Sequence, residues 1–200
     1  MKTSSYSGFY KLTPAQRQAE VAEFAGLSND DLTSSAMYIL GEKADELYEI
    51  STVGSTDWRY TTLTVPSVNN VRLPIKYYQD ATTGKAYKNL IPLIRLPELY
   101  YIAAEVHASG PAPDLNRAME LLNTVRASRG VLAALSGLSA EEIMEQITLE
   151  YRKEFISEGQ MFLYYKRKGF QTIPNSITEM KDEQYVLPFP EIDENNGIVQ

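Results

Sequence analysis

A chain of 200 residues can bury a sizeable core, and this length favours one domain over two. The formal net charge of −7 argues against sequence-independent binding to nucleic acid and against adsorption to an anionic membrane, because both need a basic face. The lack of cysteine excludes disulfides, thiolate catalysis and zinc–thiolate sites in this polypeptide. No apolar run approaches the ~20 residues of a membrane-spanning helix. The composition favours a neutral or mildly polar ligand.

Residues 1–50 are expected to form a helical block. Residues 13–16, Thr-Pro-Ala-Gln, read as a capping box with proline at the first helical position. The apolar stripe of this first helix is Ala19, Val21, Phe24 and Leu27. A second helix is predicted over residues 31–49, with Gly41 as its weak point.

Residues 51–93 are expected to be loop with short strands, because threonine, valine, proline and tyrosine dominate there. Residues 60–65 and 71–78 are the best extended candidates. Pro74 demotes the second of them to an edge or irregular strand, because proline donates no ladder hydrogen bond. Most of the aromatic side chains that are candidates for exposure lie in this segment. Its backbone is irregular, and binding residues tend to lie in such loops.

Residues 94–130 predict two antiparallel helices of the tetratricopeptide type. Apolar residues recur at three-to-four spacing in both halves. They are Leu96, Leu99, Tyr100, Ala103 and Ala104 in the first half, and Leu115, Ala118, Met119, Leu122 and Val125 in the second. Asp114 is placed to cap the second helix, residues 110–113 force the turn, and Gly130 suits a left-handed position after it.

Residues 94–170 hold this hairpin plus a further capped helix. Ser139 and Glu142 form a second capping box, and the helix that follows is predicted to end near 158–159. Its buried face is Ile143, Ile147, Tyr151 and Phe155. A short helix closed by Gly169 comes next, and residues 171–200 are expected to be an extended tail. The predicted fold is therefore mostly α, in a single domain over residues 1–200.

A catalytic reading of the charged residues is disfavoured. Glu150, Glu154 and Glu158 share one face of a helix with Arg152 roughly opposite, which is typical of an ion-pair edge between helices. We therefore predict that Arg152 or Arg126 bonds a carboxylate or carbonyl of a neighbouring helix. The single histidine, His107, forms neither a triad nor a metal site, so no enzyme activity, metal or cofactor is predicted.

The candidate ligand-binding residues lie in the loop region. An aromatic plane can stack on the apolar face of a sugar ring while neighbouring polar groups bond its hydroxyls. The candidates are Trp58, Arg59, Tyr60, Tyr77, Tyr78 and Tyr87. The alternative is that half-buried rings only attach the loop to the helices. Tyr77 and Tyr78 cannot both point outward from a regular strand.

Five motifs in order form a recognisable series over the second half of the chain. They are residues 95–105 (RLPELYYIAAE), 122–127 (LNTVRA), 150–159 (EYRKEFISEG), 164–169 (YYKRKG) and 187–192 (LPFPEI). Upstream, residues 57–59 (DWR) and 75–78 (IKYY) belong to the same series. The chain resembles the C-terminal portion, or a shortened member, of the SusD/RagB-type nutrient-binding outer-membrane lipoproteins. Tyr151 and Gln160-Met161 depart from the usual pattern.

This resemblance implies a non-catalytic, cell-surface component that binds glycans or other nutrients for a TonB-dependent uptake system. It implies a SusC-like transporter as partner and no nucleic acid. It further implies an extracellular position at the outer membrane, through a lipid anchor that this chain does not contain. The alternative is a tetratricopeptide-like protein-interaction scaffold without a ligand site of its own.

Overall fold

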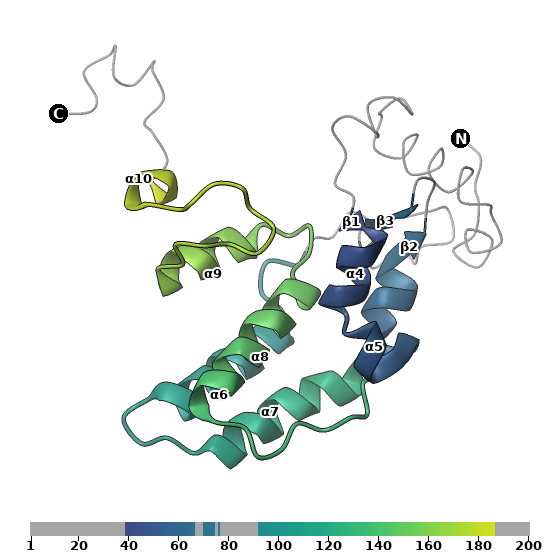
Figure 1. The fold of residues 1–200 in the computed structure, drawn as a ribbon. Coiled ribbons are helices and arrows are strands. Elements are labelled where there is room, and N and C mark those ends of the chain that lie inside the picture. Colours follow the sequence, from purple (N-terminus) through teal and green to yellow (C-terminus); the bar gives the residue numbers. More distant parts are fainter. Residues whose placement is uncertain (1–38, 67–69, 75, 77–91, 187–200) are drawn as a thin grey trace, which may run out of the picture. The chain divides into compact units, whose positions relative to one another are not determined.

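The computed structural model describes residues 39–66, 70–74, 76 and 92–186 (Figure 1). The helix predicted to begin at residues 13–16, Pro188 and Pro190 of the tail, and Tyr77, Tyr78 and Tyr87 lie outside these residues. The chain divides into two compact units, Met1–Ser157 and Glu158–Gln200, which are described separately. The described fold is mostly helical, as predicted.

The first unit begins with a small sheet and short helices. Strand β1 (Ile39–Leu40) leads directly into α4 (Gly41–Leu47), and α5 (Ile50–Val53) follows. A helix running continuously over residues 31–49 is therefore wrong, because β1 interrupts it. Leu40 is extended and pairs with Val71. Gly41 is required here: a Cβ on it would lie 2.9 Å from the carbonyl oxygen of Asn70.

The sheet has the order β1-β3-β2, with both neighbouring pairs antiparallel. Strand β2 (Thr64–Pro66) begins later than the predicted segment 60–65, because Arg59–Leu63 forms a π-helical turn instead. Strand β3 (Val71–Pro74) lies at the start of the predicted segment 71–78. Of the two alternatives predicted from Pro74, an edge or an irregular strand, the edge is wrong, since β3 is the central strand of the described sheet. Pro74 is the last residue of β3, where its missing N–H interrupts no further ladder.

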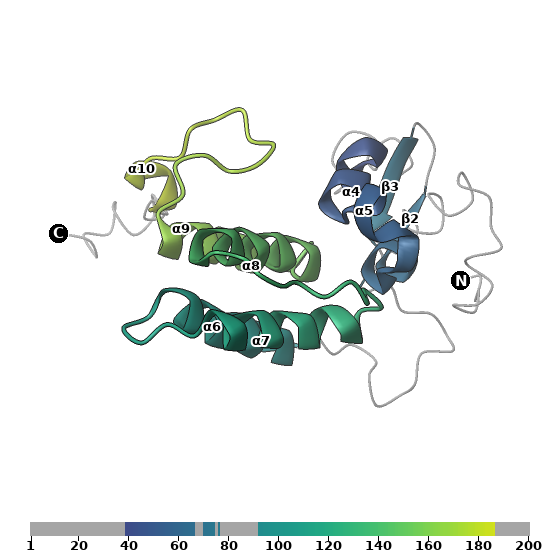
Figure 2. The same cartoon turned by 60° about the horizontal axis from the view of Figure 1, so that its bottom comes forward.

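The predicted hairpin is confirmed as α6 (Leu96–Ser109) and α7 (Leu115–Ser128). The Asp114 carboxylate accepts a hydrogen bond from the backbone N–H of Arg117 at 2.9 Å, and the Asp114 N–H donates to the His107 carbonyl. Gly130, at φ 87°, supplies the left-handed residue after α7. The α8 helix (Ala140–Glu154) packs on α6 and α7, and all three helices enclose the core (Figures 1 and 2).

The buried faces of α7 and α8 match the predicted stripes, whereas in α6 Ala104 is the one residue of the predicted stripe that is fully buried. Leu96 and Leu99 are exposed, and the buried residues of α6 are Tyr101, Ala104 and Ala108. The prediction failed because α6 carries apolar residues on two opposite sides, so that periodicity alone does not choose between them. Tyr101 packs against two rings of the α8 region, with centroid distances of 5.1 Å to Tyr151 and 6.4 Å to Phe155.

The α8 helix ends at Glu154, four residues before the predicted end, and Phe155 is its C-cap. In the second unit, α9 (Gln160–Lys168) is closed by Gly169 at φ 66°, as predicted. The tail contains one further helical turn, α10 (Asp182–Tyr185). The Tyr185 hydroxyl donates to the Phe170 carbonyl at 2.6 Å and so ties this turn back to the end of α9.

The capping box at the start of α8 gives a stability prediction. The Ser139 hydroxyl accepts from the Glu142 N–H, and the Glu142 carboxylate accepts from the Ser139 N–H at 2.8 Å. We expect Ser139→Ala to lower the free energy of unfolding by about 1 kcal/mol in urea denaturation. Ser136→Ala, at an exposed loop position, is the matched control. Equal stability of the two variants would contradict the role of the box.

Candidate ligand-binding surface around Trp58

The turn that carries Trp58 is organised by Asp57. The Asp57 carboxylate accepts from the backbone N–H of Arg59 at 2.9 Å, and the Asp57 carbonyl accepts from the N–H groups of Tyr60 and Thr61. These bonds close the π-helical turn just before β2. The sequence order Asp-Trp-Arg thus places one outward ring between two side chains that the fold buries.

Arg59 is the centre of a buried ion network. Its side chain is 1% exposed and pairs with three carboxylates. The guanidinium nitrogens lie 2.7 Å from Asp57 Oδ2, 2.9 Å from Glu150 Oε2 and 3.2 Å from Glu154 Oε2. Because Glu150 and Glu154 belong to α8, Arg59 fastens the loop region to the helical core.

The two glutamates of α8 are held by further cations, Lys153 of α8 itself and three arginines from outside α8. Glu150 Oε1 accepts from Arg126 Nη1 of α7 and from Lys153 Nζ, each at 2.9 Å. The prediction that Arg126 bonds a neighbouring helix is therefore confirmed. Glu154 accepts two bonds from Arg129, at 3.0 and 2.9 Å, and one from Arg95. The buried ion network comprises Glu49, Asp57, Arg59, Arg95, Arg126, Arg129, Glu150, Lys153 and Glu154.

The pKa values of the network carboxyls lie far below the ordinary range. Burial works to raise the pKa of Glu150, but the charges of Arg59, Lys153 and Arg126 outweigh it and hold the value at about 2. The same balance, led by Arg129, holds the pKa of Glu154 at about 2. Both groups are therefore ionised at every physiological pH, and neither has a proton to give as a general acid.

Lys76 lies beside this network, where its ammonium donates to the Glu154 carbonyl. Burial and the nearby charge of Arg95 together lower its pKa to about 7, against the opposing effect of Glu154. The region between the loop and α8 is thus crowded with cations, and the Glu154 carboxylate and carbonyl hold several of them in place.

Glu150 and Glu154 make the stability of the fold depend on acid pH. Their folded-state pKa of about 2 is below the 4.5 of an unperturbed glutamate, so the unfolded chain binds more protons as the pH falls. The free energy of unfolding should therefore decrease between about pH 4.5 and pH 2. We expect a loss on the order of 3 kcal/mol per carboxylate, measured by urea unfolding over that range.

The exposed Glu141, also on α8 and outside the network, offers a matched control for this measurement. Glu141→Gln should leave the acid limb of the stability curve unchanged, whereas Glu150→Gln should flatten it and lower the plateau. A free energy of unfolding that stays constant down to about pH 3 in the parent chain would contradict the assigned pKa values.

Trp58 is presented at the surface on a rigid support. Its indole is 59% exposed, while its backbone N–H donates to the Arg129 carbonyl at 2.8 Å. Gly130 lies directly behind the ring: a Cβ there would be 2.8 Å from the indole Nε1 and 2.5 Å from the Thr56 carbonyl oxygen. The loop and the end of α7 therefore fix the ring from one side and leave much of it open to solvent.

Tyr60 is held more tightly than Trp58. Its hydroxyl donates to Asp45 Oδ1 at 2.6 Å, and the Arg72 guanidinium lies 3.9 Å from its ring centroid. The edge contact with the buried Tyr48 has a centroid distance of 5.6 Å. The Tyr60 ring is thus half-buried and used in packing. This agrees with the alternative that half-buried rings attach the loop to the helices.

The predicted site residues consequently fall into three groups. Trp58 is exposed, Tyr60 is half-buried with its hydroxyl at the surface beside the exposed Asp45, and Arg59 is buried in the ion network. Tyr77, Tyr78 and Tyr87 lie outside the described residues. The sequence did not predict that Arg59 is buried and that its ion pairs hold in place the turn that carries Trp58 and Tyr60. The alternation of Asp57, Trp58 and Arg59 carried that signal, since two buried charged residues flank one exposed ring.

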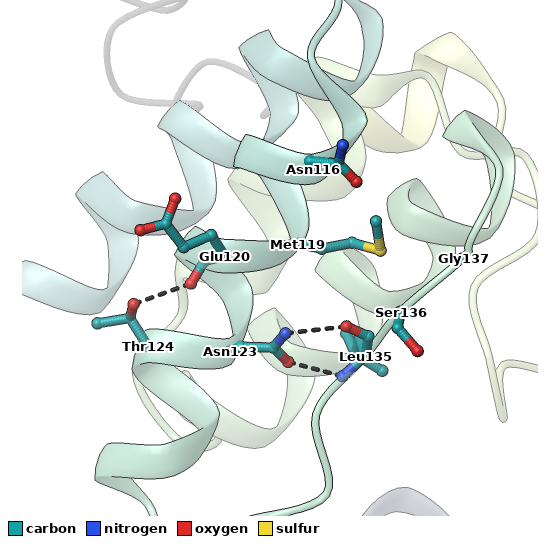
Figure 3. Close-up of a pocket in the computed structure, with 8 residues that line it drawn as sticks. All are labelled: Asn116, Met119, Glu120, Asn123, Thr124, Leu135, Ser136 and Gly137. Atoms are coloured by element: carbon teal, nitrogen blue, oxygen red, sulfur yellow. Dashed lines mark hydrogen bonds between the residues drawn. The ribbon is translucent and has the colours of Figure 1, made fainter.

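A separate recess of about 500 Å³ lies between α7 and the loop after it (Figure 3). Its lining residues are Asn116, Met119, Glu120, Asn123, Thr124, Leu135, Ser136 and Gly137. The Asn123 amide clamps the loop by bonding both the N–H and the carbonyl of Leu135, at 2.8 and 3.0 Å. The recess has no aromatic plane, and its central amide is already committed to the backbone.

Among the residues that the structure describes, no group of three or more histidine, aspartate or glutamate side chains is placed to hold a metal ion. None of the described helices is long and apolar enough to cross a membrane.

A helical hairpin packed on a capped helix, with an exposed ring on a loop that is held by buried ion pairs, defines a helical scaffold. The SusD family model matches residues 32–185, and the chain belongs to this family. No curated protein and no solved structure matches the chain.

Proposed function

We propose that this protein is a non-catalytic binding component for a glycan or a similar polyhydroxylated nutrient, with Trp58 as its stacking platform. The observation that carries the proposal is the exposed indole braced by Gly130 and by the Arg129 carbonyl. Membership of the SusD family supports a nutrient-binding role without catalysis.

The rigidity of the Trp58 mount favours binding. A ring that is already fixed in the free protein loses little conformational entropy when a ligand stacks on it. A sugar offers an apolar face to such a ring, and its hydroxyls need polar partners at the rim. Thr61 and Thr62 are exposed residues of the same turn whose hydroxyls donate to the carbonyls of Asp57 and Trp58 and can still accept a hydrogen bond. The Tyr60 hydroxyl and the Asp45 carboxylate, which bond each other, supply further acceptors.

The charged residues favour binding over hydrolysis. A glycosidase needs two carboxyl groups across a cleft, one of them with a raised pKa so that it can act as an acid. Glu150 and Glu154 have lowered pKa values, are buried and are surrounded by arginine and lysine. Their role in the proposal is to position the loop, and no step of bond cleavage is assigned to them.

The setting that we propose is the outer membrane, with the protein on the extracellular face beside a SusC-like TonB-dependent transporter. A lipid anchor would hold it there. The support for transporter, anchor and location is the family membership alone. The alternative function is an interaction scaffold without a ligand site. It predicts that substituting Trp58 does not change the affinity for any glycan.

Because Trp58 is the only tryptophan in the chain, its fluorescence reports directly on the proposed platform. A glycan array on the full chain selects the oligosaccharides to be used. We expect titration with them to shift or quench the tryptophan emission, and Trp58→Ala to weaken binding at least tenfold in calorimetry. Losing one stacked ring costs on the order of 1–2 kcal/mol, which corresponds to this change.

Leu163 provides the control for that measurement, since it is as exposed as Trp58 but lies on α9. Leu163→Ala should leave the affinity unchanged, and Trp58→Phe should retain part of it. Unchanged affinity of Trp58→Ala for every array-selected oligosaccharide would refute the platform.

A substitution at Gly130 tests whether ligand binding requires the Trp58 indole to stay in its observed position. We expect Gly130→Ala to push the indole outward, change its emission maximum and reduce ligand affinity, because a Cβ would collide with Nε1. Gly137→Ala is the matched control: this glycine also has a positive φ, of 69°, but a Cβ on it meets nothing within 4 Å. Both variants should lose on the order of 1–2 kcal/mol of stability through backbone strain. An identical spectrum and affinity in the two variants would contradict the brace.

A further inference from the structure

Three buried polar atoms in or beside the ion network have no hydrogen-bond partner within the part of the chain that the structure describes. They are the Tyr101 hydroxyl, Arg126 Nε and Glu150 Oε2. Tyr101 and Glu150 are 0% exposed, and Arg126 is 2% exposed. Leaving a buried donor or acceptor unpaired costs more than a typical hydrogen bond contributes, so such groups nearly always have a partner in native proteins. The three atoms therefore need one.

The three atoms lie around one carboxylate. Arg126 Nη1 is 2.9 Å from Glu150 Oε1, so Arg126 Nε and Glu150 Oε2 belong to two groups that already touch. Glu150 Oε2 also lies 2.9 Å from Arg59 Nη2, but as an ion pair that lacks the alignment of a hydrogen bond. Burial, followed by the charge of Glu150, raises the pKa of Tyr101, so the Tyr101 hydroxyl lies within the field of this carboxylate.

The Tyr101 hydroxyl is held in this place by the packing of its ring. The ring contacts Tyr151 and Phe155, which fixes the position of the hydroxyl oxygen. The three side chains come from α6, α7 and α8, which pack together in the first unit (Figure 2). No side chain of the ion network comes from within α6, since Arg95 is the N-cap that precedes this helix. A ligand shared by the three atoms would join α6 to α7 and α8 through polar contacts.

We propose that one buried water molecule binds between Tyr101, Arg126 and Glu150. Arg126 Nε–H can only donate, the ionised Glu150 Oε2 can only accept, and the tyrosine hydroxyl can do either. A water molecule accepts from Arg126 Nε–H and from the Tyr101 hydroxyl, and it donates to Glu150 Oε2. About three hydrogen bonds are typical of a buried water. A metal ion would be repelled by the Arg126 cation and an anion by the Glu150 carboxylate, so neither suits the three atoms. This site is separate from the proposed glycan platform and does not depend on it.

The substitution Tyr101→Phe distinguishes a water-bonded hydroxyl from an unpaired one by the sign of its effect on stability. If the water is bound, the substitution removes one of its hydrogen bonds, and we expect the unfolding equilibrium constant of the full chain in urea to rise about fivefold. If the hydroxyl is unpaired, the substitution removes a buried group that costs free energy, and the constant falls. Tyr100→Phe is the matched control, because Tyr100 is the preceding residue of α6 and is only half-buried. It should change the constant by no more than about twofold.

A crystal structure of the full chain tests the same site directly. We expect density for a single water within about 3.2 Å of the Tyr101 hydroxyl, Arg126 Nε and Glu150 Oε2. A direct hydrogen bond between Tyr101 and Glu150, or density for a metal ion or an anion at this position, would overturn the proposal. An unfolding constant that falls or stays unchanged in Tyr101→Phe would overturn it as well. Circular dichroism of both variants establishes that they are folded before their constants are compared.

Discussion

The interaction on which the rest of this structure depends is the pairing of Arg59 with Asp57, Glu150 and Glu154 inside the first unit. One guanidinium joins the carboxylate that organises the loop turn to the two carboxylates of α8. Burying these charges is costly unless every one of them has partners. Arg95, Arg126 and Arg129 supply those partners from positions distant in the sequence, and Lys153 supplies one from α8 itself. The network thus specifies one arrangement of loop and helices.

This arrangement links the stability of the fold to the proposed ligand binding at Trp58. The same Arg129 that holds Glu154 offers its carbonyl to the N–H of Trp58, and the next residue, Gly130, lies behind the indole. The end of α7 is therefore both part of the charge network and the support of the exposed ring. A binding protein gains from such coupling, because a platform fixed by buried charges is organised before the ligand arrives.

The sequence was most informative where local chemistry is decisive. The caps at Asp114 and Ser139 were predicted and are present, because capping depends on residues three positions apart. The interhelical role of Arg126 was also predicted. The choice of buried face on α6 was not, since both sides of that helix are apolar and only the position of α7 and α8 selects one. The exposed position of Trp58 agrees with expectation, whereas the burial of Arg59 required partners 91 and 95 residues away in the sequence.

The sequence by itself determined the helices of the hairpin, their caps, the capped α8 and the family to which the chain belongs. Only the tertiary structure decided that Asp57 and Arg59 turn inward while Trp58 stays outside, and that Pro74 ends a central strand. The physical reason is that local patterns fix backbone conformation through contacts a few residues apart. The burial of a charge depends instead on whether opposite charges from distant elements meet it, which no local pattern encodes.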